Sequence, residues 1–185
     1  MNAAASPVAT ARNPLWEFAV WAYELDGVAK SCLALQQRFG ADVNMIMFCL
    51  WLGSRGEGNT NLAKYLSAAL KLSREWQFNF VEPLRNCRTN LKDFLENAPL
   101  EDEHRAAMTV LRERVKQCEL DMERMQTTAL YALVGDGGAP AGQVPLDKQH
   151  DVAFNNLNVY LTATGVKLDP LGASHVRNIL DTVFS

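Results

Sequence analysis

Most of the motifs from which an enzyme is recognised are missing from this sequence of 185 residues. It has no G-x-S-x-G nucleophile turn, no P-loop, no G-x-G-x-x-G fingerprint and no aspartate-rich pair for magnesium diphosphate. The three histidines, His104, His150 and His175, lie in polar stretches rather than beside a serine or cysteine motif. We therefore predict no catalytic residue, and an enzyme is the less favoured interpretation.

The sequence also lacks a long hydrophobic run. The longest is Val43 to Leu52, whereas a transmembrane helix needs roughly 20 apolar residues. The first residues, MNAAASPVATARNP, contain no apolar signal region, and the net charge of -3 gives no general attraction to nucleic acid or anionic lipid. We expect a cytoplasmic protein that binds neither a membrane nor a nucleic acid. The short basic stripe of Arg85, Arg88 and Lys92 is interspersed with acids and is interpreted as a solvated helix face.

Neither a disulfide framework nor a metal site is expected. The four cysteines, Cys32, Cys49, Cys87 and Cys118, form no C-x-x-C pair and fall in helical stretches, so they are predicted to be small core residues in a reducing compartment. Two carboxylate-x-x-histidine pairs, at Glu101 to His104 and at Asp147 to His150, have the spacing found in di-iron bundles. The other carboxylates that such a site needs are missing from the central helical stretch, and we predict no metal and no cofactor.

What the sequence does contain is helical periodicity, without a convincing period-two stretch. Val43 to Leu52 is apolar on nearly all sides, which predicts a helix surrounded by other helices. Gly40 suits the end of the preceding helix and Asp42 the N-cap of this one. Asn13 and Pro14 predict another helix start.

The longest helical stretch carries a heptad-like seam with charged flanks. Its apolar residues recur at steps of three and four residues, at Met108, Leu111, Val115, Cys118, Met122, Met125, Ala129 and Ala132. The partner of this seam is either the stripe from Trp76 to Leu95, as an antiparallel hairpin, or a helix across a dimer interface. Pro83 predicts a kink or a new helix start near Glu82. The fold class is therefore all-α, a single bundle-like domain with a buried central helix and a long hairpin.

Composition divides the chain into four parts. Residues 1–12 are small and polar and are predicted to be disordered, and 13–134 form the helical core domain. The glycine-rich stretch 135–145 is predicted to be a flexible linker, and 146–185 a C-terminal helical segment.

A few polar and aromatic residues are candidates for a site. Asp42 and Asn44 begin the central helix and Arg55 follows its end, while Arg85 and Arg88 lie one turn apart and could hold an anion. The competing interpretation is structural: Asp42 caps its helix, Asn44 bonds to a neighbouring loop, and an arginine pairs with Asp42.

Two tryptophans are candidates for an interaction. Trp16 and Trp21 are five positions apart and point in different directions, so one of them is expected to remain at the surface and anchor a partner or a second subunit.

Three stretches of the sequence resemble a known family. They are NPLWEFAVWAYELDGVAKSCLALQQRFGADVNMIMFCLWLGSRG from Asn13, W-x-x-x-x-V-x-P-L-R-x-x-R from Trp76, and R-x-x-V-K-x-x-E-L from Arg112. The chain is similar, most densely over 13–134, to proteobacterial proteins of about this length classified as a domain of unknown function. The resemblance implies a small bacterial cytoplasmic protein and supplies no activity, cofactor or site residue.

Two functional hypotheses follow. The first is a non-enzymatic module that binds another protein or a second copy of itself. The alternative is a binding protein or enzyme for a small anion, with its site near Asn44, Arg85 and Arg88.

Overall fold

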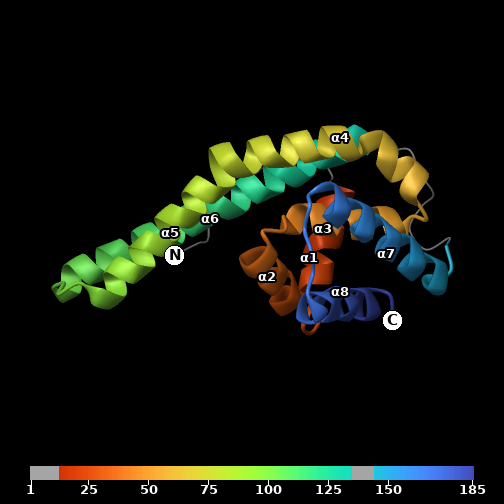
Figure 1. Cartoon of the computed structure of the whole chain (residues 1–185). Coiled ribbons are helices and arrows are strands. Elements are labelled where there is room, and N and C mark those ends of the chain that lie inside the picture. The colour runs from red at the N-terminus through yellow and green to blue at the C-terminus, as the bar shows by residue number, and fades with distance from the viewer. Residues whose placement is uncertain (1–12, 135–143) are drawn as a thin grey trace.

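The computed structural model describes residues 13–134 and 144–185, and within these ranges every regular element is helical. The predicted all-α class is thereby confirmed. A compact body is built from five helices, α1 (Pro14–Glu24), α2 (Val28–Phe39), α3 (Val43–Ser54), α7 (Leu146–Ala163) and α8 (Pro170–Val183). A long hairpin crosses this body and extends well beyond it (Figure 1). No helix in the described ranges is long and apolar enough to cross a membrane.

Helix α3 is the centre of the body, as its sequence predicts. Every residue from Asn44 to Ser54 is buried. Gly40 ends α2 with φ of +68°, a left-handed conformation that favours glycine, and Asp42 caps α3 by accepting a hydrogen bond of 2.9 Å from the backbone N–H of Asn44. Other helices cover α3 on several sides, with α7 and α1 packed most closely.

The contact between α3 and α7 depends on a glycine. A Cβ atom placed on Gly53 would lie 2.5 Å from Cβ and 2.7 Å from Cα of Ala153. The two helix backbones can approach this closely only because both residues are small. The C-terminal helix α8 packs against α2, so the last 40 or so residues contribute directly to the hydrophobic core.

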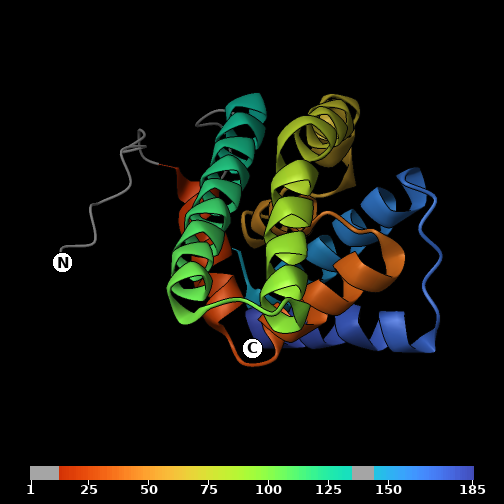
Figure 2. The same ribbon diagram turned by 90° about the vertical axis from the view of Figure 1, so that its left-hand side faces the viewer.

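The hairpin consists of two nearly continuous helical rods. One rod is α4 (Asn59–Trp76), a π-helical turn (Gln77–Val81) and α5 (Glu82–Asn97), and the other is α6 (Asp102–Val134). The π turn lies directly before Pro83, whose missing N–H disrupts the regular bonding pattern, and α5 starts at Glu82 as predicted. Seen end-on, the rods lie side by side (Figure 2). The seam of α6 therefore has an intramolecular partner.

The outer half of the hairpin, residues 82–118, is called the arm below. None of its residues is buried, because two helices without a third layer cannot enclose a side chain. Its tip is held by Arg105, whose guanidinium donates to the backbone carbonyls of Leu95 and Ala98.

The arm also explains where the prediction for the cysteines was wrong. Cys32 and Cys49 are buried in the body as expected. Cys87 and Cys118 are exposed, because the arm has no core in which they could be enclosed. Residues 1–12, predicted to be disordered, and residues 135–143 of the predicted linker lie outside the described residues.

Candidate functional site

A network of polar side chains lies where the arm meets the body. Asp42 accepts hydrogen bonds from Ser73 Oγ at 2.5 Å and from Gln126 Nε2 at 2.6 Å, in addition to its cap on α3. Its backbone N–H donates to the hydroxyl of Tyr160 at 2.9 Å. Asp42 thus joins α3 to α4, α6 and α7 through neutral donors and acceptors.

Gln126 is the centre of this network and is completely buried. Its Oε1 accepts from Asn44 Nδ2 at 2.8 Å and from Gln77 Nε2 at 3.1 Å, while its amide nitrogen donates to Asp42. Asn44 also donates to the backbone carbonyl of Glu123. Because the amide has both its oxygen and its nitrogen bonded, its position relative to α3 and the π turn is fixed.

The two predicted arginines meet carboxylates of α6. Arg85 is 3.0 Å from Glu119 Oε1 and 3.1 Å from Glu123 Oε1. Arg88 is 2.5 Å from Glu119 Oε2 and 3.3 Å from its Oε1. The carboxylate of Glu119, only 8% exposed, therefore receives both guanidinium groups. Hydrogen bonding to Glu119 raises the pKa of Arg88 above its ordinary value.

A cleft of about 670 Å³ opens between this network and the body, and it is called the junction cleft below. Its volume lies within the range of about 300–1,000 Å³ that small-molecule sites occupy. Apolar side chains in its lining include Trp16, Val20, Leu33, Met47 and Leu120. Polar side chains in its lining include Asp42, Asn44, Arg85, Arg88, Glu119 and Glu123.

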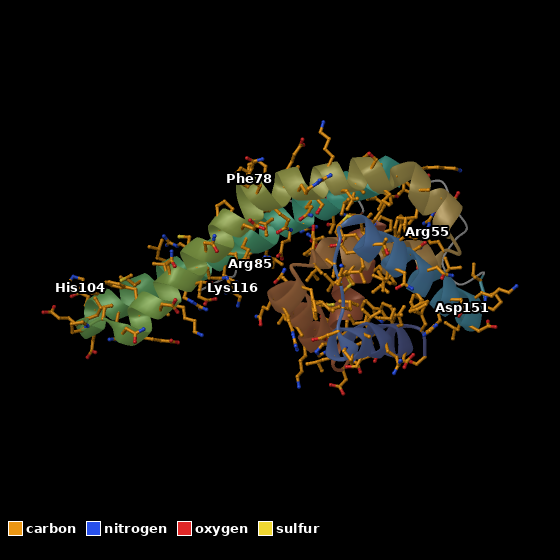
Figure 3. All side chains as sticks on the ribbon, viewed as in Figure 1. Arg55, Phe78, Arg85, His104, Lys116 and Asp151 are labelled. Carbon is orange, nitrogen blue, oxygen red and sulfur yellow. The ribbon has the colours of Figure 1, made fainter. Side chains whose placement is uncertain are left out.

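The structure brings four of the five predicted ligand residues to this cleft, and Arg55 is the exception. Arg55 lies at the other end of α3, where it pairs with Glu57 at 3.0 Å and covers the ring of Trp51 at 4.7 Å (Figure 3). Of the two predicted interaction residues, Trp16 lines the cleft. Trp21 is 47% exposed and packs against Phe18, with ring centroids 5.5 Å apart.

The carboxylate-x-x-histidine pairs lie far from the cleft and from each other. His104 is at the tip of the arm, and Asp151, next to His150, is at the opposite end of the molecule (Figure 3). His150 is 3.2 Å from Asp181, and His104 is 3.9 Å from Glu101. Among the described residues, no group of three or more histidine, cysteine and acidic side chains could hold a metal ion.

Burial sets the electrostatics of the cleft. It raises the pKa of Asp42, and the hydrogen bonds from Ser73, Gln126 and the backbone oppose this shift. Burial also raises the pKa of Glu123, with Arg85 opposing the shift and Glu119 and Asp42 adding to it. Both carboxylates are therefore harder to ionise than in water.

The raised pKa of Asp42 has a consequence for stability. The native state holds this proton more tightly than the unfolded state, so stability from this group is complete below the ordinary aspartate pKa and is lost as the pH rises through the native pKa. Compared with Asp42→Asn, which keeps the N-cap, the wild type should be favoured more strongly at about pH 4 than at about pH 8. Denaturant unfolding of both proteins at both pH values measures the difference between their free energies of unfolding. This difference should change by about 1.4 kcal/mol for every pH unit that separates the pKa of Asp42 in the native state from its pKa in the unfolded state. A difference that is the same at both pH values would contradict the assignment.

The hypothesis of an anionic ligand stays a prediction, and the geometry weighs against it. Arg85 and Arg88 are already bound to carboxylates, so neither offers an unneutralised cation to a ligand. The structural interpretation predicted the cap by Asp42 correctly. The partners of the two arginines, however, are Glu119 and Glu123 rather than Asp42, because these acids lie on the side of α6 that faces α5.

Comparison with known proteins identifies one family. The family model described as "Protein of unknown function (DUF2390)" matches residues 14–130, which include α1 to α5 and nearly all of α6. Neither the curated proteins nor the solved structures include a match.

Proposed function

The chain belongs to the family described as Protein of unknown function (DUF2390), and from that premise we propose that it is a non-enzymatic protein-interaction module whose arm binds a second copy of the chain. The observation that carries the proposal is the arm itself, in which residues 82–118 include no buried side chain. An isolated helical hairpin without a core gains little from packing, since most helical stability in proteins comes from burial of an apolar face. A partner helix pair would supply that burial.

The outward face of α5 is the surface that we assign to the partner. Phe80, Pro83, Cys87, Leu91 and Phe94 follow one another at steps of three or four residues and so lie on one side of the helical rod. Phe80 is 43% and Phe94 50% exposed. A shallow groove on the arm is lined by Pro83, Cys87, Leu91 and Phe94. Met108 of α6 also lines this groove, so the apolar surface extends over both helices of the arm.

Charge favours a second copy as the partner. The arm, residues 82–118, contains seven basic and seven acidic side chains, while the whole chain has a net charge of -3. The arm carries charges of both signs and no net charge, so two arms can approach without net repulsion and can form reciprocal pairs.

The size of the face is also sufficient for a weak dimer. A hairpin face as long as α5, 16 residues, covers about 24 Å by about 20 Å. Two such faces would bury roughly 1,000 Å² in total, which is near the lower limit of a specific interface.

Mass measurement in solution tests this proposal. Light scattering after size exclusion should give the mass of a dimer at tens of micromolar protein, and Phe94→Glu should weaken self-association at least about tenfold, because it places a charge in the apolar face. Leu171→Glu is the matched control, since Leu171 on α8 is 51% exposed and lies outside the arm. A wild-type protein that remains monomeric at these concentrations, or equal effects of the two substitutions, would overturn the proposal.

A further inference from the structure

The junction cleft has more negative than positive charge. Three cations line it, Arg85, Arg88 and Lys116, and they face five carboxylates, at Glu24, Asp42, Glu113, Glu119 and Glu123. The lining therefore has two carboxylates more than it has cations, and Arg112, which lies outside the lining, compensates for one of them by pairing with Glu113 at 2.8 Å. A ligand that adds positive charge would restore the balance, whereas an anion would increase the excess.

The distribution of partners shows where the excess is located. Arg85 and Arg88 converge on Glu119, and Glu123 shares Arg85 through only one of its oxygens, Oε1. Within the described residues, neither Asp42 nor the exposed Glu24 has a cationic partner. Among the described residues, the lining carboxylates that a ligand's cation could still reach are thus Glu123 and Glu24, since the carboxylate of Asp42 is occupied by the hydrogen bonds from Ser73 and Gln126.

The cleft also offers an apolar surface for the uncharged part of such a ligand. Val20, Leu33 and Leu120 are 39%, 42% and 43% exposed, and all three line this cleft. They come from α1, α2 and α6, so the body and the hairpin both contribute to the apolar lining. Trp16 lines the cleft as well and adds an aromatic surface.

From these observations we infer that the junction cleft binds an organic cation with an apolar stem. The ammonium or guanidinium group lies against Glu123 and Glu24, and the stem packs on Val20, Leu33 and Leu120. Aromatic and aliphatic walls around a few charged groups are the usual composition of sites for such ligands. The chemistry is the same for a free amine and for a lysine or arginine side chain of a partner protein.

The test uses three ligands of nearly the same shape that differ in charge. Isothermal titration calorimetry of the full-length protein with 4-phenylbutylammonium, 4-phenylbutan-1-ol and 4-phenylbutyrate should give measurable binding of the ammonium compound in the millimolar range or tighter. The alcohol should bind at least about fivefold more weakly and the carboxylate more weakly still. Equal or tighter binding of 4-phenylbutyrate would overturn the inference.

Two substitutions locate the charge contact. Glu123→Gln should weaken binding of 4-phenylbutylammonium about tenfold, the loss expected for one charge-assisted hydrogen bond. Glu24→Gln should weaken it as well, and because Glu24 is exposed this substitution leaves the fold intact. The matched control is Glu17→Gln, which removes an exposed acid from the same helix but outside the cleft. Unchanged affinity in both cleft variants, or an equal loss in Glu17→Gln, would contradict the assignment.

A second pair of probes separates the two sources of the cation. The peptide acetyl-Leu-Lys-Leu-amide is compared with acetyl-Leu-Gln-Leu-amide. Tighter binding of the lysine peptide than of 4-phenylbutylammonium indicates a protein side chain as the natural occupant, and the reverse order indicates a free amine. Either order supports a cation site, whereas preference for the glutamine peptide together with no binding of the amine would exclude it.

Discussion

Replacement of Gly53 by alanine should lower the free energy of unfolding by about 2 kcal/mol or more, although alanine is the better helix former. At an ordinary helical position this change stabilises by about 0.5–1 kcal/mol. At Gly53 the added methyl group would lie 2.5 Å from Cβ of Ala153 and 2.8 Å from its backbone nitrogen. Because a backbone cannot rotate away as a side chain can, α3 and α7 must separate. Overpacking typically costs about 1–3 kcal/mol and occasionally more, and a clash with backbone atoms should fall at the upper end, so the cost exceeds the propensity gain. Urea denaturation followed by circular dichroism measures the loss.

A double-mutant cycle shows whether the effect comes from this contact. Ala153→Gly in the Gly53→Ala background removes the nearest methyl group and should recover part of the loss, but not all of it, since the backbone of Ala153 remains close. If Gly53→Ala stabilises the protein, or if the two changes are additive, α3 and α7 are not packed as described.

The second large effect is expected for Gln126→Leu, which should cost about 3 kcal/mol. Leucine has a similar volume but removes the acceptor for Asn44 Nδ2 and Gln77 Nε2 and the donor to Asp42 Oδ2. Each buried polar group that loses its partner costs about 1–3 kcal/mol, and the remaining bonds of Asn44 and Asp42 reduce the sum. Denaturant unfolding is again the measurement.

Gln117→Leu is the matched control for this substitution. Gln117 lies on the same helix, is exposed, and donates a hydrogen bond from its Nε2 to Asp121 Oδ1 at 3.2 Å. Its replacement should change stability by no more than about 0.5 kcal/mol. Comparable losses for the two variants would contradict the assignment of the loss to the buried network around Gln126.

The helical architecture could be predicted because its signals are local. The cap at Asp42, the glycine at position 40 and the uniform apolarity from Val43 to Leu52 act within a few residues, and the structure confirms each. The antiparallel partner of the α6 seam was one of two alternatives, since periodicity defines a face but not what covers it. The exposure of Cys87 and Cys118 could not be read from periodicity for the same reason.

The site was predictable only in part. The sequence points to Asp42, Asn44, Arg85 and Arg88. It does not point directly to their partners, Glu119 and Gln126. A signal was present: Glu119 and Gln126 are seven residues apart, and each follows a seam residue by four positions, so both lie on the apolar face of α6. Polar residues on a buried face indicate an internal network. Which residues would meet them depends on tertiary packing and cannot be obtained from spacing alone.

Helix α6 passes without interruption from the body to the tip of the arm. Its 33 residues span about 50 Å, and the outer 17 or so of them extend about 26 Å from the level of Glu119. Over that length a tilt of about 10° at the base displaces the tip by about 4 Å, roughly the width of a side chain. The buried bonds of Gln126 to Asp42 and Asn44 therefore fix the angle at which α6 leaves the body, and that angle determines where the tip of the arm lies.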